Sequence, residues 1–255
     1  MSNILAIAQK ELKSYFASPI AYVVIGLFAL LYGYFYVAIL SYFVRQSMQL
    51  RQFGGPQSMN INQDMIRPLL QNVTVLVLFF LPMVTMRTYS EEKRSGTIEL
   101  LLTSPLTDFQ IIMGKFIGAL TLYAIMLGVT LIHTGVLFVY GNPEWKPLMT
   151  SYLGLLLLGG CFISVGLLIS SLTKNQIVAG MVTFAVFLFL WVITWIGSFS
   201  GPTMNELTTY LSIIDHFEDF AKGVIDTTHV IYYVSFITFG LFLTAKAVDS
   251  ERWRG

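Results

Sequence analysis

The chain has 255 residues, of which 55% are hydrophobic and only 11% are charged, and its 15 Lys and Arg residues nearly balance its 14 Asp and Glu residues. An ordinary soluble domain carries about 25% charged residues, so this chain has too few to surround a core with a polar surface. The composition excludes a soluble enzyme, and the near-neutral charge excludes a nucleic-acid binder that depends on electrostatic attraction. Cys161 is the single cysteine, which excludes a scaffold held by intrachain disulfides.

Residues 1–18 have the periodicity of an amphipathic helix. One face collects apolar side chains, namely Ile4, Leu5, Ala8, Leu12, Tyr15 and Phe16. The opposite face carries Gln9, Lys10 and Lys13, whereas Glu11 falls among the apolar residues. The pattern predicts an interfacial helix that lies on the membrane and leads into the first span.

Six apolar stretches are long enough to cross a bilayer, which takes roughly 20 residues. They cover residues 19–44, 72–86, 116–140, 149–172, 177–199 and 230–245, and none contains Asp, Glu, Lys or Arg. The second is the shortest, and we expect Pro82 to kink it. Residues 45–70, which include Gly54-Gly55-Pro56, are polar and are expected to form an exposed loop.

An even number of spans places both termini on one side of the membrane. One side then holds ten of the 15 basic residues, and the other holds Arg45, Arg51, Arg67, Lys146 and Lys222. Because basic residues concentrate on the cytoplasmic side, both termini are predicted to be cytoplasmic.

The spans offer little chemistry of their own. His133 is their one imidazole, and we expect it to bond a neighbouring helix rather than to relay protons, so proton coupling is not expected. Gly114-Lys115 is the only Gly-Lys pair, and it lacks the second glycine and the following hydroxyl of a phosphate-binding loop. Any work that this chain performs must therefore draw its energy from a partner.

Residues 87–110 form a charged and then apolar connector between the second and third spans. Ser90, Glu91 and Glu92 favour the start of a helix, and Gly96 is expected to break it. Residues 97–103 are predicted to form about two helical turns that end at Ser104-Pro105. Thr107 and Gln110 have the spacing of a capping box at the start of the third span.

The apolar residues of this connector have two interpretations. Ile98, Leu100, Leu101 and Leu102 either lie against lipid and the bundle, or form a knob that enters a groove on a cytosolic partner. The residues alone favour neither interpretation.

The connector EEKRSGTIELLLTSP (residues 91–105) resembles that of type-2 ABC transporter permeases, the membrane halves of ATP-driven exporters. LISSLTKNQIVAG (residues 168–180) is similar to the link between their fourth and fifth spans. KELKSYFASPIAYVVIG (residues 10–26) near the start, and HFEDFAKGVID (216–226) with VIYYVSF (230–236) near the end, resemble the branch of gliding-motility-type permeases. The copper-maturation-type permeases are a neighbouring branch. The resemblance implies one all-α, polytopic membrane domain over residues 1–255 with six transmembrane helices. Besides the interfacial helix (1–18) that the periodicity predicts, it implies a cytoplasmic coupling connector (88–107) and external re-entrant helices (200–229) before the last span.

The resemblance further implies that residues 97–103 are a coupling helix seated in the cleft of a separate ATPase. The implied ATPase-contacting residues are Glu91, Glu92, Gly96, Thr97, Ile98, Glu99, Leu100, Leu101, Leu102 and Pro105. This chain would then hold no catalytic residue and no cofactor, because ATP and magnesium would bind to the partner.

The implied partners are cytoplasmic ATPase subunits, a second permease half in a homo- or heterodimer, an accessory extracytoplasmic or membrane protein, and the lipid bilayer. The implied location is a bacterial inner membrane. The function expected is that of a subunit that couples ATP hydrolysis to export. The alternative is a non-transporting anchor that transmits ATPase motion to an extracytoplasmic motility or envelope assembly.

The segment between Gly201 and His229 is predicted to form an external amphipathic helix. Its apolar residues recur at helical spacing, and they are Phe217, Phe220, Ala221, Val224 and Ile225. His216, Glu218, Asp219 and His229 match no tight metal-ligand spacing, so no metal site is predicted.

Small residues are also spaced to bring helix backbones together. They are Gly114, Gly118, Gly154, Gly159, Gly160, Gly166 and Gly180, and we expect them to pack helices within the chain rather than to form a dimer seam.

Overall fold

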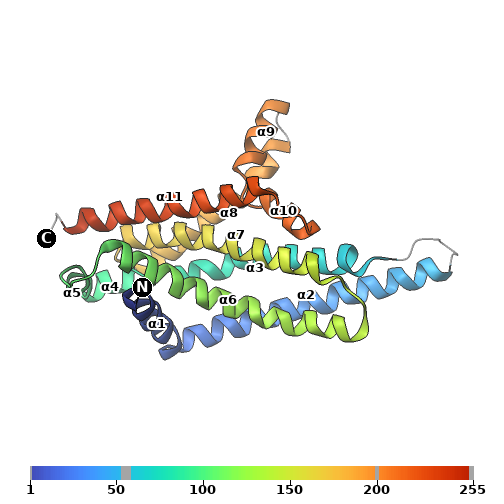
Figure 1. The fold of residues 1–255 in the computed structure, drawn as a ribbon, viewed down its shortest axis with the longest axis horizontal. Coiled ribbons are helices and arrows are strands. Elements are labelled where there is room, and N and C mark those ends of the chain that lie inside the picture. The colour runs from blue at the N-terminus through green and yellow to red at the C-terminus, as the bar shows by residue number, and fades with distance from the viewer. Residues whose placement is uncertain (1, 53–58, 199–200, 253–255) are drawn as a thin grey trace.

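The computed structural model describes residues 2–52, 59–198 and 201–252, and the regular structure within these ranges is helical throughout. Figure 1 shows long helices that run along one axis, with both chain termini at the same end of the bundle. We call this the terminal end and the opposite one the distal end.

The helices follow one another with short connections. Those of the first half are α1 (Ser2–Ala17), α2 (Pro19–Gln52), the π-helical turn η1 (Asn62–Ile66), α3 (Arg67–Thr85), α4 (Ser90–Ser95) and α5 (Ile98–Leu102). Those of the second half are α6 (Asp108–Tyr140), α7 (Trp145–Leu172), α8 (Gln176–Ser198), α9 (Pro202–Leu211), α10 (Asp215–Lys222) and α11 (Thr227–Arg252).

Six helical segments of the described chain are long and apolar enough to cross a membrane. They are Pro19–Leu50, Asn62–Ser95, Asp108–Tyr140, Trp145–Leu172, Gln176–Ile193 and Thr227–Glu251. The predicted all-α polytopic fold with six spans is confirmed. The predicted fifth span ended at residue 199, which lies outside the described residues.

The prediction of a loop over residues 45–70 is wrong. Residues 45–52 continue α2, and Asn62–Ile66 form a π-helical turn that runs directly into α3. Residues 45–52 are mostly Arg, Gln, Met and Leu, which favour helix, so α2 continues beyond its apolar part. Gly54, Gly55 and Pro56 lie outside the described residues.

The predicted helix at the N-terminus forms, and its place on a membrane surface stays a prediction. The kink predicted at Pro82 also stays a prediction. Pro82 lies inside α3, which ends one turn later, where the Met86 N–H donates to the Pro82 carbonyl at 2.9 Å.

The bundle is organised around α3 and α7. Within the apolar part of each, 67% and 72% of the residues are buried, against 22% for α2 and 17% each for α8 and α11. Helices α3 and α7 are therefore the core, and α2, α8 and α11 present apolar side chains to their surroundings, as lipid-facing helices do.

Close helix contacts in this core depend on glycine. A Cβ at Gly159 would collide with the ring of Tyr123, and one at Gly166 would collide with Thr85. At the terminal end, a Cβ at Gly114 would lie 2.6 Å from the Cβ of Ile7. An added Cβ would also come too close to a neighbouring side chain at Gly118, Gly154 and Gly160, and Gly180 packs against Met86. The predicted packing of helices within the chain by these glycines is therefore confirmed.

The region before the last span forms two helices rather than one. Helix α9 projects away from the bundle and α10 lies along it (Figure 1). Phe217, Phe220 and Ala221 are buried as predicted, but Gly223 at φ +92° ends α10. Val224 and Ile225 therefore lie beyond the helix and are exposed, which corrects their predicted place on its apolar face. Whether these helices re-enter the membrane stays a prediction.

We expect Gly114→Ala to lower the free energy of unfolding by about 1–3 kcal/mol, because the added methyl group pushes α1 away from α6. Gly128→Ala, on the same helix, is the matched control, since nothing lies within 4 Å of its Cβ position. Thermal unfolding of the purified protein and tryptic cleavage after Lys10 and Lys13 measure the effect. Equal melting temperatures and equal cleavage in the two variants would contradict this packing.

Candidate functional site

The connector between α3 and α6 folds largely as its residues predict. Helix α4 ends at Gly96, whose φ of +73° is the left-handed conformation that suits glycine. Thr107 and Gln110 form the predicted capping box at the start of α6, with two reciprocal hydrogen bonds of 3.3 Å. Helix α5 is shorter than the two turns predicted, since it covers only Ile98–Leu102.

The structure divides the predicted ATPase-contacting residues into two groups. Gly96, Thr97, Glu99, Leu100 and Pro105 are exposed at the terminal end, and the Leu100 side chain is 72% exposed. Ile98 is half-buried and packs against the core, whereas nothing is described for the side chains of Leu101 and Leu102.

Glu91 and Glu92 form the second group, because they are partly buried and make ion pairs within the chain. The connector therefore consists of α5, which exposes apolar and polar side chains, and α4, which is bonded to other helices of the chain.

A buried ammonium group, that of Lys115, contacts α4. The Lys115 side chain of α6 is 1% exposed, and its Nζ lies 2.8 Å from Glu11 Oε1 of α1 and 2.9 Å from Glu92 Oε2 of α4. The same Nζ donates to the Thr88 carbonyl at 2.8 Å and lies 5.0 Å from the centre of the Tyr89 ring. A buried charge is tolerated only when it is paired and hydrogen-bonded, and Lys115 meets both conditions.

The buried pair explains the irregularity in the N-terminal helix. Glu11 lies on the apolar face of α1 because that face packs on α6, where Lys115 stands between Gly114 and Gly118. The two glycines leave room for Ile7 and for the Cβ of Glu11. Sequence reasoning missed the pair, although a lone acidic residue on an apolar face was its signal.

The tyrosine of α1 adds a second link to the connector. The Tyr15 hydroxyl donates to the Val84 carbonyl at 3.2 Å and lies 3.3 Å from Thr88 Oγ1. Burial raises the pKa of Tyr15, so the hydroxyl keeps its proton and stays a donor.

The start of α4 is capped by a residue from a distant helix. Ser170 Oγ of α7 accepts from the backbone N–H groups of Tyr89 and Ser90, at 3.0 and 3.1 Å, and donates to the Met86 carbonyl at 3.1 Å. These N–H groups have no partner inside a helix that begins there. Ser170, in the segment LISSLTKNQIVAG, therefore caps α4, a role that was not predicted from the sequence.

Ion pairs fix the remaining sides of α4. Arg87 binds both carboxylate oxygens of Glu91, at 2.9 and 3.1 Å, and reaches Ser18 Oγ at 3.3 Å between α1 and α2. Lys93, whose side chain is 3% exposed, lies 2.5 Å from Glu251 Oε1 of α11. Helix α4 is therefore bonded to α1, α6, α7 and α11, and through Arg87 to Ser18 between α1 and α2.

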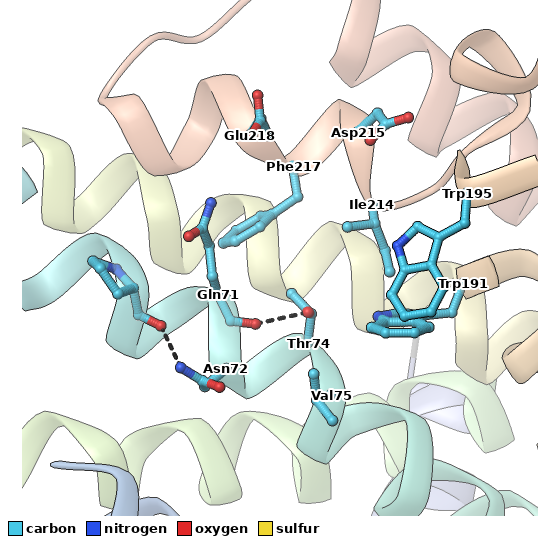
Figure 2. Close-up of a pocket in the computed structure, with 11 residues that line it drawn as sticks. Gln71, Asn72, Thr74, Val75, Trp191, Trp195, Ile214, Asp215, Phe217 and Glu218 are labelled. Carbon is cyan, nitrogen blue, oxygen red and sulfur yellow. Dashed lines mark hydrogen bonds between the residues drawn. The ribbon is translucent and has the colours of Figure 1, made fainter. Parts of the chain in front are cut away.

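A cavity of about 370 Å³ opens near the distal end between α3, α8 and α10. Figure 2 shows Trp191 and Trp195 on one wall, Gln71 and Asn72 on another, and Asp215 and Glu218 along α10. The two indole rings are 5.0 Å apart, and Glu218 lies 3.7 Å from Arg67. The cavity thus offers aromatic surface beside hydrogen-bonding groups, the usual mixture in sites for small molecules.

The other histidines meet beside this cavity. His216, Asp219 and His229 are in hydrogen-bond contact, whereas Glu218 instead pairs with Arg67 and Lys222. Among the described residues, no group of three or more His, Cys, Asp or Glu could hold a metal ion. His133 stacks edge-on against Tyr32, and no hydrogen bond to its Nδ1 is found.

Comparison with known proteins agrees with this architecture. The model of the ABC-2 family transporter proteins matches residues 5–248. The chain is also similar to the probable multidrug ABC transporter permease YbhR of Escherichia coli strain K12, with 30% identity over 146 residues, which is 55% of this chain and 38% of that protein.

The YbhR protein of Escherichia coli O157:H7 matches to the same extent. The match spans 38% of the length of these relatives. Because the family model covers almost the whole chain, the chain belongs to the ABC-2 transporter family.

Proposed function

We propose that this chain couples ATP hydrolysis by a separate cytoplasmic ATPase to the export of a substrate, with α5 as the contact to that ATPase. The proposal places the terminal end in the cytoplasm of a bacterium and the distal end outside. The family supports an ATPase partner, and the charge bias of the sequence supports the orientation.

The observation that carries the proposal is the position of Leu100. Leu100 is 72% exposed on the short connector helix α5, where its side chain suits an apolar groove on a partner. Glu99 and Thr97 beside it are exposed and polar, as at the rim of a protein interface.

The bonds around α4 supply the mechanical link. A force on α5 passes through Gly96 to α4, where the ion pair of Glu92 and Lys115 transfers it to α6. Glu11 brings α1 into the same unit, and Ser170 brings α7. A connector bonded to several helices moves them together, as a switch between two packed arrangements requires.

The distal cavity supports transport rather than mechanical anchoring. Its walls combine indole rings with amides and a hydroxyl, at Gln71, Asn72 and Thr74, and a sealed apolar seam would have no such groups. We propose that an exported substrate with both apolar and hydrogen-bonding groups contacts this cavity before release.

Exchange of Leu100 and Leu101 for Asp is expected to lower ATP turnover of the complete complex by at least about tenfold. A buried interface residue of this kind contributes about 2 kcal/mol or more, and a carboxylate in an apolar groove is not compensated. Turnover is measured on the complex of this chain with its ATPase in lipid nanodiscs.

Leu100→Met is the matched control, since it keeps an apolar side chain of similar volume and should retain turnover. Membrane insertion should be unchanged in both variants. Normal turnover in the double Asp variant, at normal insertion, contradicts the assignment of α5.

Lys115→Met is expected to lower the free energy of unfolding by about 3–5 kcal/mol, because Glu11 then loses its counter-charge and Glu92 keeps only its pair with the exposed Lys10, at 3.4 Å. Adding Glu11→Gln and Glu92→Gln removes the stranded charges and should restore most of the melting temperature. The triple variant should still show reduced ATP turnover, because the ionic links between α1, α4 and α6 are gone.

Lys246→Met, at an exposed lysine of α11, is the control and should change neither quantity. A single Lys115 variant that melts like the unmodified protein would show that the buried pair does not hold these helices.

A further inference from the structure

Two histidines link three elements at the distal end, and the coupling mechanism uses neither. His216 is the second residue of α10, and its Nδ1 lies 2.6 Å from Nδ1 of His229 in the first turn of α11. His216 Nε2 lies 3.0 Å from the Tyr210 carbonyl of α9. His229 Nε2 lies 2.9 Å from Asp219 Oδ2 of α10.

The partners of the two rings fix how many protons they hold. A carbonyl oxygen only accepts, so His216 Nε2 carries a hydrogen, and an ionised carboxylate requires the same of His229 Nε2. The two facing Nδ1 atoms form a hydrogen bond only if one of them carries a hydrogen and the other does not. The pair therefore holds three protons and one positive charge.

The surroundings of His216 oppose a charge on that ring. Burial lowers the pKa of His216, and the His229 charge lowers it further, although the Tyr210 carbonyl and Asp215 act in the opposite direction. The hydrogen bond from His229, together with that from Lys222, lowers the pKa of Asp219, so this carboxylate is ionised. The positive charge that the two rings share therefore lies next to the ionised Asp219 carboxylate.

Other groups face the pair from each neighbouring element. From α10 these are Asp215 and Asp219, with Lys222 bonded to Asp219 and Glu218 bonded to Lys222. From α9 it is the Tyr210 ring, and from α11 they are Tyr232 and Tyr233. The segment before α11 contributes Asp226, and α3 contributes Arg67 through Glu218. The α7 residues bonded to α10, Thr150 and Ser151, are uncharged.

Helix α10 stands between this pair and the cavity. Asp215, Phe217 and Glu218 line the cavity, whereas His216 and Asp219 bond to His229. The Tyr232 hydroxyl also donates to the carbonyl of Leu211 at the end of α9, and the Tyr233 hydroxyl donates to that of Ile213 in the α9–α10 linker. Those bonds persist at any pH near neutrality, since a phenol ionises near pH 10, so only the histidine bond changes with pH.

We propose that His216 and His229 form a pH-sensitive latch that fixes α10, one wall of the distal cavity, to α11 while the two rings share one positive charge. Loss of the shared proton at higher pH leaves two lone pairs facing each other, and the latch opens. Gain of a further proton places two N–H groups and two charges face to face, and the latch opens again. Because the pKa of His216 is lowered, this second opening occurs below the ordinary histidine value of 6.5.

Nitrogen NMR of the full chain in lipid nanodiscs, with ¹⁵N-labelled histidine, tests the latch. The chain has three histidines, and His133→Gln removes the one that lies elsewhere. We expect a coupling between the two Nδ1 nuclei across their hydrogen bond that is maximal at an intermediate pH. It should fall at both ends of a titration from about pH 5 to about pH 8. Two rings that titrate independently, without this coupling at any pH, would overturn the proposal.

Tryptophan fluorescence gives a second readout, because Trp191 and Trp195 line the cavity together with Ile214 and Phe217. We expect a bell-shaped pH dependence for the unmodified chain and for His133→Gln. His216→Asn keeps an acceptor near the Nδ1 position and should lose only the acidic limb, whereas His229→Gln should give no pH response.

A bell-shaped response that persists in His229→Gln would overturn the latch. Neither measurement needs the ATPase, so failure of the latch and failure of the proposed coupling are separate results.

Discussion

The buried ammonium of Lys115 is the interaction on which the terminal end of this protein depends. It joins α1, α4 and α6 through Glu11, Glu92 and the Thr88 carbonyl. Such a cluster is not needed for stability alone, since apolar residues of similar volume often do as well. What it provides is a fixed geometry, because a buried charge loses several kilocalories per mole if either carboxylate moves away. Helix α4 is thereby held at one position relative to the bundle.

Helix α7 extends this constraint to the distal end. Near one end Ser170 caps α4, and near the other Thr150 and Ser151 bond the Phe220 carbonyl at the end of α10. About 30 Å of continuous helix separates the two contacts. Gly159 and Gly166 let Tyr123 and Thr85 pack directly on its backbone, so α7 has little freedom to bend. Helix α7 therefore connects α4 with the end of α10, the helix that forms one wall of the cavity.

The sequence predicts the parts of this architecture that follow from local chemistry. The length of the apolar stretches predicted the six spans. Gly96 predicted the end of α4, and Thr107 predicted the cap of α6. The prediction of a loop over residues 45–70 was wrong because it rested on the polarity of the segment. Residues 45–52 have high helix propensity and continue α2.

The bonds between distant residues could not be found in this way. Glu11 and Lys115 are 104 positions apart, and no periodicity pairs them. Ser170 lies in an apolar run in which a serine has no distinguishing signal, and its partners are backbone groups of another helix. His216, Asp219 and His229 belong to two helices that were predicted as one segment, so their contact depends on the turn at Gly223.

The most direct test of the coupling claim is photo-crosslinking from position 100 in the assembled transporter. A benzoylphenylalanine in place of Leu100 should crosslink to a separate ATPase chain during ATP hydrolysis, and one in place of Leu211, exposed near the distal end, should not. A complex that hydrolyses ATP but gives no ATPase crosslink from position 100, or that gives one from position 211, would contradict the account.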